Sequence, residues 1–485
     1  MSNIGQPDAA GSSAALIQAQ RHAVAQLLRI SPVADALGEH FSRAGHEIAL
    51  VGGSVRDAMR DELGHDLDFA TSAHPDETER LVGEIADSVW DIGKEFGTIG
   101  GRFGELVCEI TTYRTDRYDG TTRKPEVSYG DSLEGDLRRR DFTVNSMAVR
   151  LPGQDFVDPF GGLRDLGAGV LRTPGRAEDS FDDDPLRMMR AARFASQLQF
   201  RVDPDVVEAV TAMAERISIV SPERVRDELS KLLMTPEPTA GLALMVDTGL
   251  ADHVLPELPA LKLEIDEHHH HKDVYEHSLT VLEQAIDLEP DGPDLTLRLA
   301  ALLHDIGKPA TRRFESGGGV TFHHHEVVGA RLTANRLKAL RYPREVTNDV
   351  SRLVELHLRF HGYAQGEWTD SAVRRYVRDA GPLLARLHRL TRADCTTRNR
   401  RKASALSRAY DGLEARIAEL ASQEELAAIR PDLDGNEIMQ VLDIGPGREV
   451  GQAYAYLLER RLDRGPVDKD VAAQELREWW QQRDG

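Results

Sequence analysis

The spacing of apolar residues changes once along the chain. From His46 to Thr112, short apolar runs of strand length alternate with segments of helical spacing, and beyond Asp179 the apolar residues recur at helical spacing to the C-terminus. A period near two predicts strands, and a period near 3.6 predicts helices. The sequence therefore predicts an α+β protein, with a small α/β head that contains a mixed sheet and a long helical body.

Individual elements of the head follow from these runs. We expect helices over residues 15–43, 54–63 and 75–86, and strands over residues 46–51, 66–71, 89–93, 98–102 and 106–112. Residues 116–131 are rich in Gly, Thr, Asp and Arg, which predicts a mobile loop. In the helical body, Pro and Gly predict breaks at residues 221–222, 235–236, 256, 317–319 and 362.

The chain is long enough for several domains. Its 485 residues suffice for about three or four domains of roughly 100–200 residues each. We expect a disordered tail, a head, a helical neck, a second helical domain and a helical C-terminal tail. Their expected bounds are 1–14, 15–172, 173–255, 256–400 and 401–485.

Composition indicates a reducing compartment. Cys108 and Cys395 are the two cysteines, too few for a disulfide framework and spaced unlike any zinc motif. Residues 1–13 contain Gly, Pro, Ser and Ala without an apolar core, so they do not resemble a signal peptide. No apolar run approaches the roughly 20 residues of a membrane helix. We expect a cytoplasmic protein with no membrane partner.

The formal net charge of the chain is −21. A charge of this sign argues against nonspecific binding of nucleic acid by the protein as a whole. Phosphate contacts need only a local group of Arg and Lys side chains, so a local basic groove stays compatible with the acidic total.

The densest candidate chemistry lies between residues 51 and 70. Residues 51–57 read VGGSVRD and join a predicted strand to a predicted helix, and residues 66–70 read DLDFA in the next predicted strand. Residues i and i+2 of a strand point to one face, so Asp66 and Asp68 can meet one metal cluster. Glycine lets the backbone approach a ligand closely. This arrangement predicts a site that holds a nucleoside triphosphate on divalent metal.

Four further motifs follow in order. They read DLRRRDFTVNSMA at 136–148, DPFGGLRDL at 158–166, DDPLRMMRAARF at 183–194 and SPERVRDEL at 221–229. With the glycine pair and the paired aspartates, this series resembles the bacterial class II CCA-adding tRNA nucleotidyltransferases and their relatives, the bacterial poly(A) polymerases. The resemblance covers about residues 44–233. It implies a polymerase-β-like nucleotidyltransferase head followed by an all-α neck.

The resemblance also implies roles for residues in these motifs. Asp66 and Asp68 match the catalytic metal-binding carboxylates, which would hold two Mg²⁺ ions, one at the RNA 3′-hydroxyl and one at the triphosphate. Gly53, Arg56 and Arg140 match positions that contact the nucleotide.

Neighbouring residues leave alternatives open. Glu109, on a later predicted strand, is either a third carboxylate at the metals or a solvated side chain. Asn145 is a candidate for orienting the sugar or a phosphate, and Asp57 for an ion pair with an arginine. Arg138 and Arg139 are equally a solvated charge run, and we leave them out of the predicted site.

The resemblance assigns base recognition to Asp184 and Arg187. An aspartate accepts from an exocyclic amine, and an arginine donates to acceptors on the Watson–Crick edge. Cytosine and adenine carry that amine, whereas uracil and guanine present a carbonyl. Arg190 and Arg193 follow at a spacing of three, on or near the same helix face, and complete the predicted nucleotide-binding set.

A second resemblance lies in the middle of the chain. Residues 301–309 read ALLHDIGKP, and the order of histidines and aspartates around them is that of an HD-type phosphohydrolase domain. Side chains of these types on neighbouring helices can bind one or two divalent metals, here of unidentified kind, and activate a water. The two domains together resemble actinobacterial-type members of the CCA-adding family. The expected ligands are His277, His304, Asp305, His325, His357 and Asp394.

Other charged and histidine-rich segments have no assigned role. His268–His271 is either a loop or a set of metal ligands, the same alternatives apply to His323 and His324, and His361 is unassigned. Basic residues late in the chain either bind tRNA phosphates or form a solvated helix face. They are Arg374, Arg375, Arg378, Arg398, Arg400, Arg401 and Lys402.

The leading functional prediction is template-independent addition of C, C and A to tRNA 3′ ends, with CTP and ATP as substrates. A poly(A) polymerase, or an enzyme that adds part of the CCA sequence, shares the same head and stays an alternative. A third alternative makes the HD-type domain the main activity, as a phosphohydrolase on RNA ends or nucleotides. The oligomeric state is open.

Overall fold

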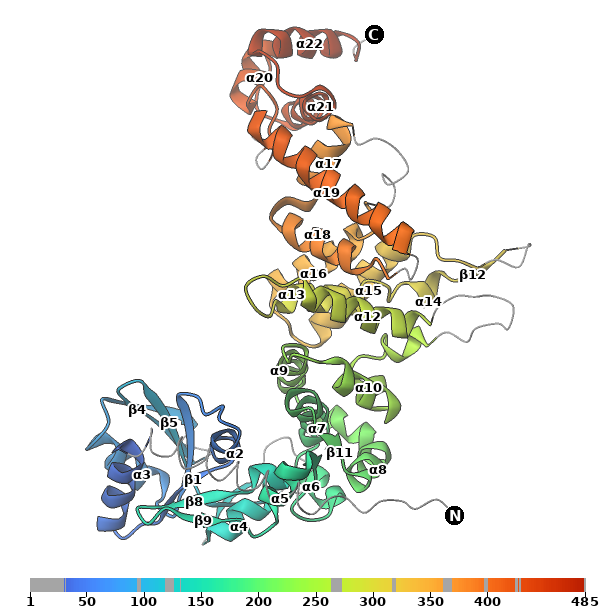
Figure 1. The fold of residues 1–485 in the computed structure, drawn as a ribbon. Helices are drawn as coiled ribbons and strands as arrows, with labels where there is room; N and C mark the ends of the chain where they lie inside the picture. The colour runs from blue at the N-terminus through green and yellow to red at the C-terminus, as the bar shows by residue number, and fades with distance from the viewer. Residues whose placement is uncertain are drawn as a thin grey trace. The chain divides into compact units, whose positions relative to one another are not determined.

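The protein forms two compact units in a computed structural model, Met1–Pro256 and Glu257–Gly485. Figure 1 shows the ribbon of both units. The described residues, to which all statements below apply, are 30, 32–93, 97–117, 126–130, 132–262, 273–315, 320–360, 369–396, 400–423, 426 and 429–483. The expected N-terminal tail, residues 1–14, lies outside them.

A seven-stranded mixed sheet forms the head, in the order β3-β4-β5-β2-β1-β8-β9. Its strands are β1 (Ile48–Val51), β2 (Asp66–Thr71), β3 (Ser88–Gly93), β4 (Thr98–Phe103), β5 (Leu106–Thr112), β8 (Ala148–Leu151) and β9 (Asp155–Val157). The β2–β5 pair is parallel and the other neighbours are antiparallel. This topology confirms the predicted mixed sheet.

The two faces of the sheet bury different side chains. Leu67 and Phe69 join a core with helices α2 (Gly53–Met59) and α3 (Pro75–Gly83). The opposite face packs a smaller core, which includes Ala70, against α4 (Leu133–Arg138). Because side chains alternate along β2, Asp66 and Asp68 belong to the face that α2 and α3 do not cover.

Helix α5 (Gly162–Ala168) belongs to the head, since its Leu163 and Leu166 pack against the head core. The first unit continues as a helical neck. Its helices are α6 (Ala177–Asp183), α7 (Leu186–Leu198), α8 (Pro204–Met213), η3 (Ala214–Ile219), α9 (Pro222–Leu233), α10 (Thr239–Asp247) and α11 (Leu250–Val254). Helices α7 and α10 approach closely at Gly241, where a Cβ atom would lie 2.3 Å from the Ala192 carbonyl oxygen. Only glycine fits this contact without a shift of backbone.

The second unit is almost entirely helical. Its helices are η4 (Pro259–Leu261), α12 (Val274–Asp287), α13 (Leu295–Leu303), α14 (Lys308–Thr311), α15 (His325–Ala339), α16 (Arg344–Leu356), α17 (Asp370–Ala380), η5 (Gly381–Leu383), α18 (Leu384–Ala393), α19 (Arg400–Gln423), α20 (Gly435–Leu442), α21 (Arg448–Arg464) and α22 (Lys469–Gln481). The last three pack around their own apolar cluster, which includes Ile438, Leu457 and Leu476. None of the helices described in the chain is both long and apolar enough to cross a membrane.

Two sequence expectations need correction. The segment predicted as a loop over 116–131 is flanked and partly occupied by an antiparallel ribbon of β6 (Arg114–Arg117) and β7 (Glu126–Tyr129), while 118–125 and 131 lie outside the described residues. Thr115, Val127 and Tyr129 supply the strand propensity that the Gly- and Asp-rich composition concealed. The helical body also contains short strands: β11 (Arg201–Val202) pairs with β10 (Val170–Leu171), and β12 (Arg313–Phe314) pairs with β13 (Val320–Thr321).

Candidate functional site

Three carboxylates lie on the face of the head sheet that α2 and α3 do not cover. Asp66 and Asp68 are exposed and Leu67 between them is buried, as the strand alternation predicts. Glu109 is exposed on β5 and lies in parallel register with Asp68, so its side chain shares their face. The backbone N–H of Asp68 donates to Ser54 Oγ at 2.9 Å, which ties the strand to α2.

The carboxylates repel one another. Desolvation of its carboxylate by the surrounding protein raises the pKa of Asp68. The Asp66 charge adds to this rise, while the Arg140 and Arg56 charges oppose it. Burial also raises the pKa of Glu109, helped by the charges of Asp68 and Asp66. Carboxylate oxygens are the ligands that Mg²⁺ prefers. This donor set therefore fits divalent cations, which would relieve the repulsion.

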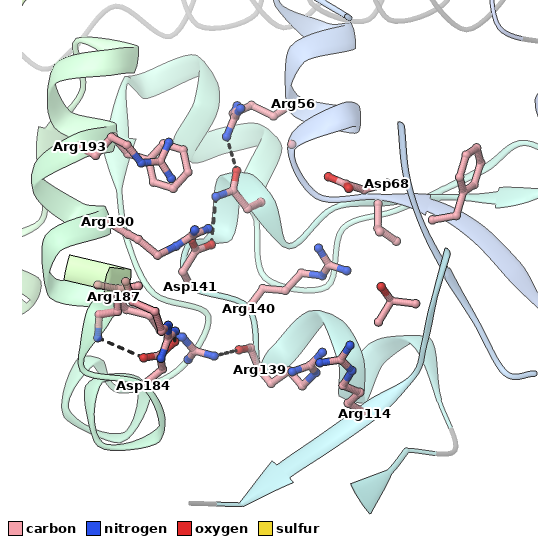
Figure 2. A pocket seen from close by; sticks show the side chains of 18 residues that line it. Arg56, Asp68, Arg114, Arg139, Arg140, Asp141, Asp184, Arg187, Arg190 and Arg193 are labelled. Carbon is pink, nitrogen blue, oxygen red and sulfur yellow. Dashed lines mark hydrogen bonds and ion pairs between the residues drawn. The ribbon is translucent and has the colours of Figure 1, made fainter. Parts of the chain in front are cut away.

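An arginine-rich cavity of about 680 Å³ opens beside these carboxylates. Figure 2 shows its side chains converging from the head and from the neck. Eight arginines line it against three aspartates, so the cavity is basic although the protein is acidic. The lining charged residues are Arg56, Arg114, Arg139, Arg140, Arg187, Arg190, Arg193, Arg224, Asp68, Asp141 and Asp184. A cavity of this charge suits a triphosphate.

The predicted nucleotide-binding residues Arg56 and Arg140 both lie near the glycine pair. Gly52 adopts φ 69°, and a Cβ atom there would lie 2.6 Å from Arg140 Nη1. Glycine thus allows the Arg140 guanidinium to lie against the turn. Gly53, the first residue of α2, lines the cavity with both arginines. Asp57 forms the predicted ion pair, accepting from Arg56 Nε at 2.8 Å.

A buried aspartate, Asp136, also holds the Arg140 side chain in place. Asp136 accepts from Arg140 Nη2 at 3.0 Å and from Arg139 Nε at 3.2 Å. Burial raises the pKa of Asp136, but the two arginine charges outweigh it and hold the pKa below its usual value. Arg138, which does not line the cavity, lies over the Phe160 ring at 5.3 Å.

A chain of hydrogen bonds crosses the cavity wall from the neck to α2. Arg190 donates to Asp141 Oδ2 from Nε at 2.8 Å and from Nη2 at 2.6 Å. Asp141 Oδ1 accepts from Asn145 Nδ2 at 3.0 Å, and Asn145 Oδ1 accepts from Arg56 Nη1 at 2.5 Å. Burial raises the pKa of Asp141, yet Arg190 and Asn145 hold it well below its usual value. Asp141 was absent from the predicted site, although it stands next to Arg140.

Asp184 and Arg187 lie together at the junction of α6 and α7, as Figure 2 shows. Asp184 Oδ1 accepts from the Leu186 N–H at 3.1 Å, and Asp184 Oδ2 lies 2.7 Å from Arg224 Nη2. Arg187 donates to Ser180 Oγ at 2.8 Å and to the carbonyl oxygen of Arg139. Arg224 belongs to the SPERVRDEL motif at 221–229, but nothing in the spacing of that motif indicates that Arg224 pairs with Asp184.

Arg193 makes a different kind of contact from the other predicted arginines. Its guanidinium pairs with Glu228 of α9, donates to Gln197 at 2.6 Å and lies 4.0 Å from the Phe194 ring centroid. Arg193 lines the cavity, and it also fastens α7 to α9. Its ion pair therefore joins α7, which begins just after Asp184, to α9, which carries Arg224.

In the second unit, all six expected ligands come together in two groups. His277, His304 and Asp394 form one, and Asp305, His325 and His357 form the other; within each group the candidate ligand atoms lie within 4.8 Å of one another. Asp305 faces both groups. Its Oδ2 lies 3.2 Å from His304 Nε2, and its Oδ1 lies 3.2 Å from His325 Nε2.

The imidazoles are oriented by the backbone. The Nδ1 atoms of His304, His325 and His357 lie 2.8, 2.8 and 2.6 Å from carbonyl oxygens, which leaves each Nε2 directed at the cluster. Burial lowers the pKa of His304, but Asp305 outweighs it and raises the pKa to about 9. Burial and the His304 charge lower the pKa of His357 to about 4. This donor set fits one or two divalent ions.

The remaining histidines and basic residues behave differently. His324 is exposed and lies outside both groups, as does His323, and His268–His271 and His361 lie outside the described residues. Arg375 pairs with Glu459 and Asp463 of α21, both at 2.8 Å. Arg374 is buried, and Arg378 lies 3.7 Å from Glu459. Arg400 and Arg401 lie on α19, and Arg398 and the Lys402 side chain are not described.

Three family models match the chain in order. The poly A polymerase head domain matches residues 48–172, a probable RNA and SrmB-binding site of polymerase A matches 199–261, and the HD domain matches 274–399. The matched head domain and its mixed sheet make the protein a nucleotidyltransferase, and the third match adds an HD domain.

Similar proteins of known name identify the family within this enzyme class. The chain is 36% identical over 422 residues to the A-adding tRNA nucleotidyltransferase of Deinococcus radiodurans, a match that covers 85% of this chain and 91% of the relative. It belongs to the tRNA nucleotidyltransferase family, which confirms the resemblance seen in the sequence. The CCA-adding enzyme of Lactobacillus johnsonii is 39% identical over 217 residues, or 44% of this chain and 53% of that enzyme. That match thus spans about half of the length of the Lactobacillus enzyme.

Solved structures share the fold over nearly the whole chain. The Bacillus stearothermophilus CCA-adding enzyme in complex with CTP aligns with a TM-score of 0.66 and 23% identity, covering 93% of this chain and 98% of that one. The Thermotoga maritima CCA-adding enzyme complexed with tRNA aligns with a TM-score of 0.57 and 18% identity, covering 94% and 96%. At these identities the likeness shows the fold alone.

Proposed function

We propose that this nucleotidyltransferase completes tRNA 3′ ends by adding C, C and A from CTP and ATP without a nucleic-acid template. The observation that carries the proposal is one basic cavity that joins the carboxylate strand to the Asp184–Arg187 pair. The reacting phosphates and the base of one nucleotide can therefore be held together. The A-adding tRNA nucleotidyltransferase of Deinococcus radiodurans, by its name, supports tRNA as the acceptor, and the CCA-adding enzymes among the relatives support CCA as the added sequence.

The end of the cavity beside the carboxylate strand would bind the metal ions and the phosphates. Mg²⁺ held by Asp66 and Asp68, with Glu109 as the third carboxylate, would supply charge neutralisation at the triphosphate and at the attacking 3′-hydroxyl. Arg56 and Arg140 bind phosphate oxygens by charge-assisted hydrogen bonds. Asn145 fixes the direction of the Arg56 guanidinium.

Base selection follows from the donors and acceptors at the other end. Asp184 accepts from the exocyclic amine of cytosine or adenine, and Arg187 donates to the neighbouring ring nitrogen. Uracil and guanine would place a carbonyl at the carboxylate and an N–H at the guanidinium, so neither contact forms. The same pair accepts both natural substrates and rejects the other two.

Addition of A alone is the alternative with a specific observation behind it, because the Deinococcus relative that matches most of the chain carries that name. Three tRNA substrates separate the possibilities: one ends at the discriminator base, one at the first C and one at the second C. CCA addition predicts incorporation on all three from CTP and ATP. Growth on only the third would establish an A-adding enzyme, and a long A tract on any of them a poly(A) polymerase.

The HD cluster supports a second candidate activity, hydrolysis of phosphate esters at RNA ends or in nucleotides. The supporting observation is that the two oxygens of Asp305 face two different ligand groups, an arrangement suited to a pair of divalent ions. Metal content and phosphate release are measured together on RNA with a 3′-phosphate or a 2′,3′-cyclic phosphate. Turnover that disappears in His304→Ala, with nucleotide addition retained, supports this activity; absence of turnover with metal bound contradicts it.

A further inference from the structure

We propose that one face of the β12–β13 ribbon is a surface on which a base of RNA stacks when the phosphate at the RNA end lies in the HD cluster. The inference rests on the proposed hydrolysis of phosphate esters at RNA ends. The two strands pair in antiparallel fashion in the part of the chain between α14 and α15. Figure 1 shows β12 projecting from the helices of the second unit beside α14.

The ribbon is tied to the HD cluster on both sides. Before β12, Lys308 opens α14, and its Nζ lies 2.6 Å from Asp305 Oδ2. After β13, the carbonyl oxygen of Phe322 lies 2.8 Å from His325 Nδ1 and accepts from the His325 backbone N–H at 3.3 Å. Lys308 Nζ also lies 5.8 Å from the centroid of the Phe322 ring, so the two sides meet. The base of the ribbon therefore lies beside the expected metal ligands.

The strand register divides the side chains of the ribbon between two faces. Phe314 is the partner of Val320, and Arg313 is the partner of Thr321. Cross-strand partners share a face, and successive side chains alternate. Phe314 and Val320 therefore belong to one face, and Arg313 and Thr321 to the other. Glu315 lies on the second face as well, because Thr321 Oγ1 donates to its carboxylate at 3.0 Å.

The first face combines an exposed aromatic ring with positive charge. Phe314 is 67% exposed, more than any other large apolar side chain among the described residues. The Arg312 Cζ lies 4.7 Å from the centroid of the Phe314 ring, which places this cation on the same face. Alternation continues the face to Phe322, against Lys308. We call Arg312, Phe314, Val320 and Phe322 the stacking face.

This composition fits single-stranded RNA. An aromatic ring stacks on the π-face of any base, and an arginine beside it attracts the phosphate backbone. The acidic Glu315 belongs to the opposite face and does not oppose that attraction on the stacking face. An RNA end can therefore place a base on Phe314 while its terminal phosphate lies among the ligands of the HD cluster.

The test uses a short RNA with a 3′-phosphate and 2-aminopurine at either of its last two positions, added to the full chain loaded with Mn²⁺. Stacking on an aromatic ring quenches 2-aminopurine, so a titration reports both stacking and affinity. Phe314→Ala is expected to weaken binding by about tenfold and to abolish the quenching. Phe314→Tyr should retain both. Phe314→Leu keeps apolar area without a ring and should behave like Phe314→Ala.

Arg312 and Arg313 form a matched pair, because they are adjacent in the chain and lie on opposite faces. Arg312→Ala should weaken binding by about threefold to tenfold, and Arg313→Ala should leave it within about twofold. Equal losses would mean an attraction of phosphates by charge alone and would overturn the stacking face. Phe156→Ala, at an exposed ring on β9 of the head, is the control for the ring and should leave the quenching unchanged.

Phosphate release separates the stacking face from the proposed hydrolysis. Phe314→Ala should lower kcat/KM about tenfold on the same RNA without the probe, through KM, and should change nothing on RNA whose last two nucleotides lack bases. Quenching that depends on Phe314 in a protein that releases no phosphate supports the stacking face and overturns only the hydrolysis. Quenching retained by Phe314→Ala with its metal bound overturns the stacking face, whatever the rate of hydrolysis.

Discussion

The arginine-lined cavity of the first unit and the histidine cluster of the second are assembled from different kinds of contact. In the cavity, several of the charged side chains already have a charged protein partner, such as Arg190 with Asp141 and Arg224 with Asp184. In the cluster, the imidazoles turn toward a shared centre, and the two oxygens of Asp305 face one histidine of each group. The cavity spreads its charged side chains over about 680 Å³, whereas the candidate ligand atoms of each group in the cluster lie within 4.8 Å of one another.

This difference bears on how each site tolerates change. In a network of paired charges several side chains share the task of orienting a ligand. The loss of one arginine should therefore alter ligand orientation or selectivity only in part. A metal cluster depends on ligand number and geometry, so loss of one ligand removes the ions as a group. The comparison therefore predicts a wide range of effects in the first unit and an all-or-none effect in the second.

The largest effect is expected at the carboxylate strand. Asp68→Ala should lower nucleotide addition by at least about a thousandfold, because it removes a ligand of the ions that stabilise the phosphoryl-transfer transition state. Asp66→Ala should act similarly. Single-turnover incorporation of labelled CTP measures the loss, and Asp155→Ala, an exposed aspartate on β9, is the control. Near-normal incorporation by a folded Asp68→Ala protein would contradict the assignment.

The second effect tests whether the two sites are independent. Asp305→Asn should remove the divalent ions of the HD cluster and leave nucleotide addition within about twofold of the natural protein. Elemental analysis and an addition assay on one preparation measure both. His324→Ala, a change at an exposed histidine next to the cluster, should retain the ions. If addition collapses while the circular dichroism spectrum is unchanged, the sites are coupled and the division is wrong.

A smaller effect is expected at Glu109. Glu109→Gln should raise the Mg²⁺ concentration needed for half-maximal addition and lower the rate at limiting Mg²⁺, by about ten- to a hundredfold. The reason is the loss of one charge in register with Asp68. Glu105→Gln, in the turn before β5, is the matched control. An unchanged Mg²⁺ titration would mean that Glu109 is only a solvated strand residue.

The smallest effect concerns stability. Asp141→Asn should lower the free energy of unfolding of the first unit by about 1–3 kcal/mol at pH 7, because Arg190 loses its charged partner. The pKa of Asp141 is lowered in the fold, so its stabilisation is complete above the unfolded value near 3.9 and is lost as the pH falls through the folded value.

Denaturant unfolding at several pH values checks this sign. The difference between the natural protein and Asp141→Asn should stay constant from pH 7 to pH 5 and narrow below about pH 4. A difference that grows on acidification would show that the carboxyl group is protonated in the fold. Arg190→Lys should lose less stability than Asp141→Asn, because the buried carboxylate keeps a cation beside it, whereas Asp141→Asn leaves the Arg190 guanidinium without this charged partner.

Local spacing was enough to predict the carboxylate strand, and the change from period two to period 3.6 was enough to predict a mixed-sheet head followed by a helical body. Asp66 and Asp68 lie on one face of β2 because successive side chains of a strand alternate, and this holds whatever packs around it. The resemblance to an HD-type domain placed His304 and Asp305 in one ligand cluster, and the structure brings them together with Asp305 Oδ2 3.2 Å from His304 Nε2. The ribbon of β6 and β7 was missed, because a Gly- and Asp-rich composition hides a pairing between segments about ten residues apart.

The head and the helical body could be predicted from the chain alone, because periodicity and contiguous motifs are properties of the local backbone. Which charges meet could not be predicted in this way: Arg224 pairs with Asp184 across 40 residues, and Arg190 with Asp141 across 49. Such partners depend on how the neck helices pack against one another and the head. Helical spacing tells which face a side chain occupies, and packing decides what stands opposite to it.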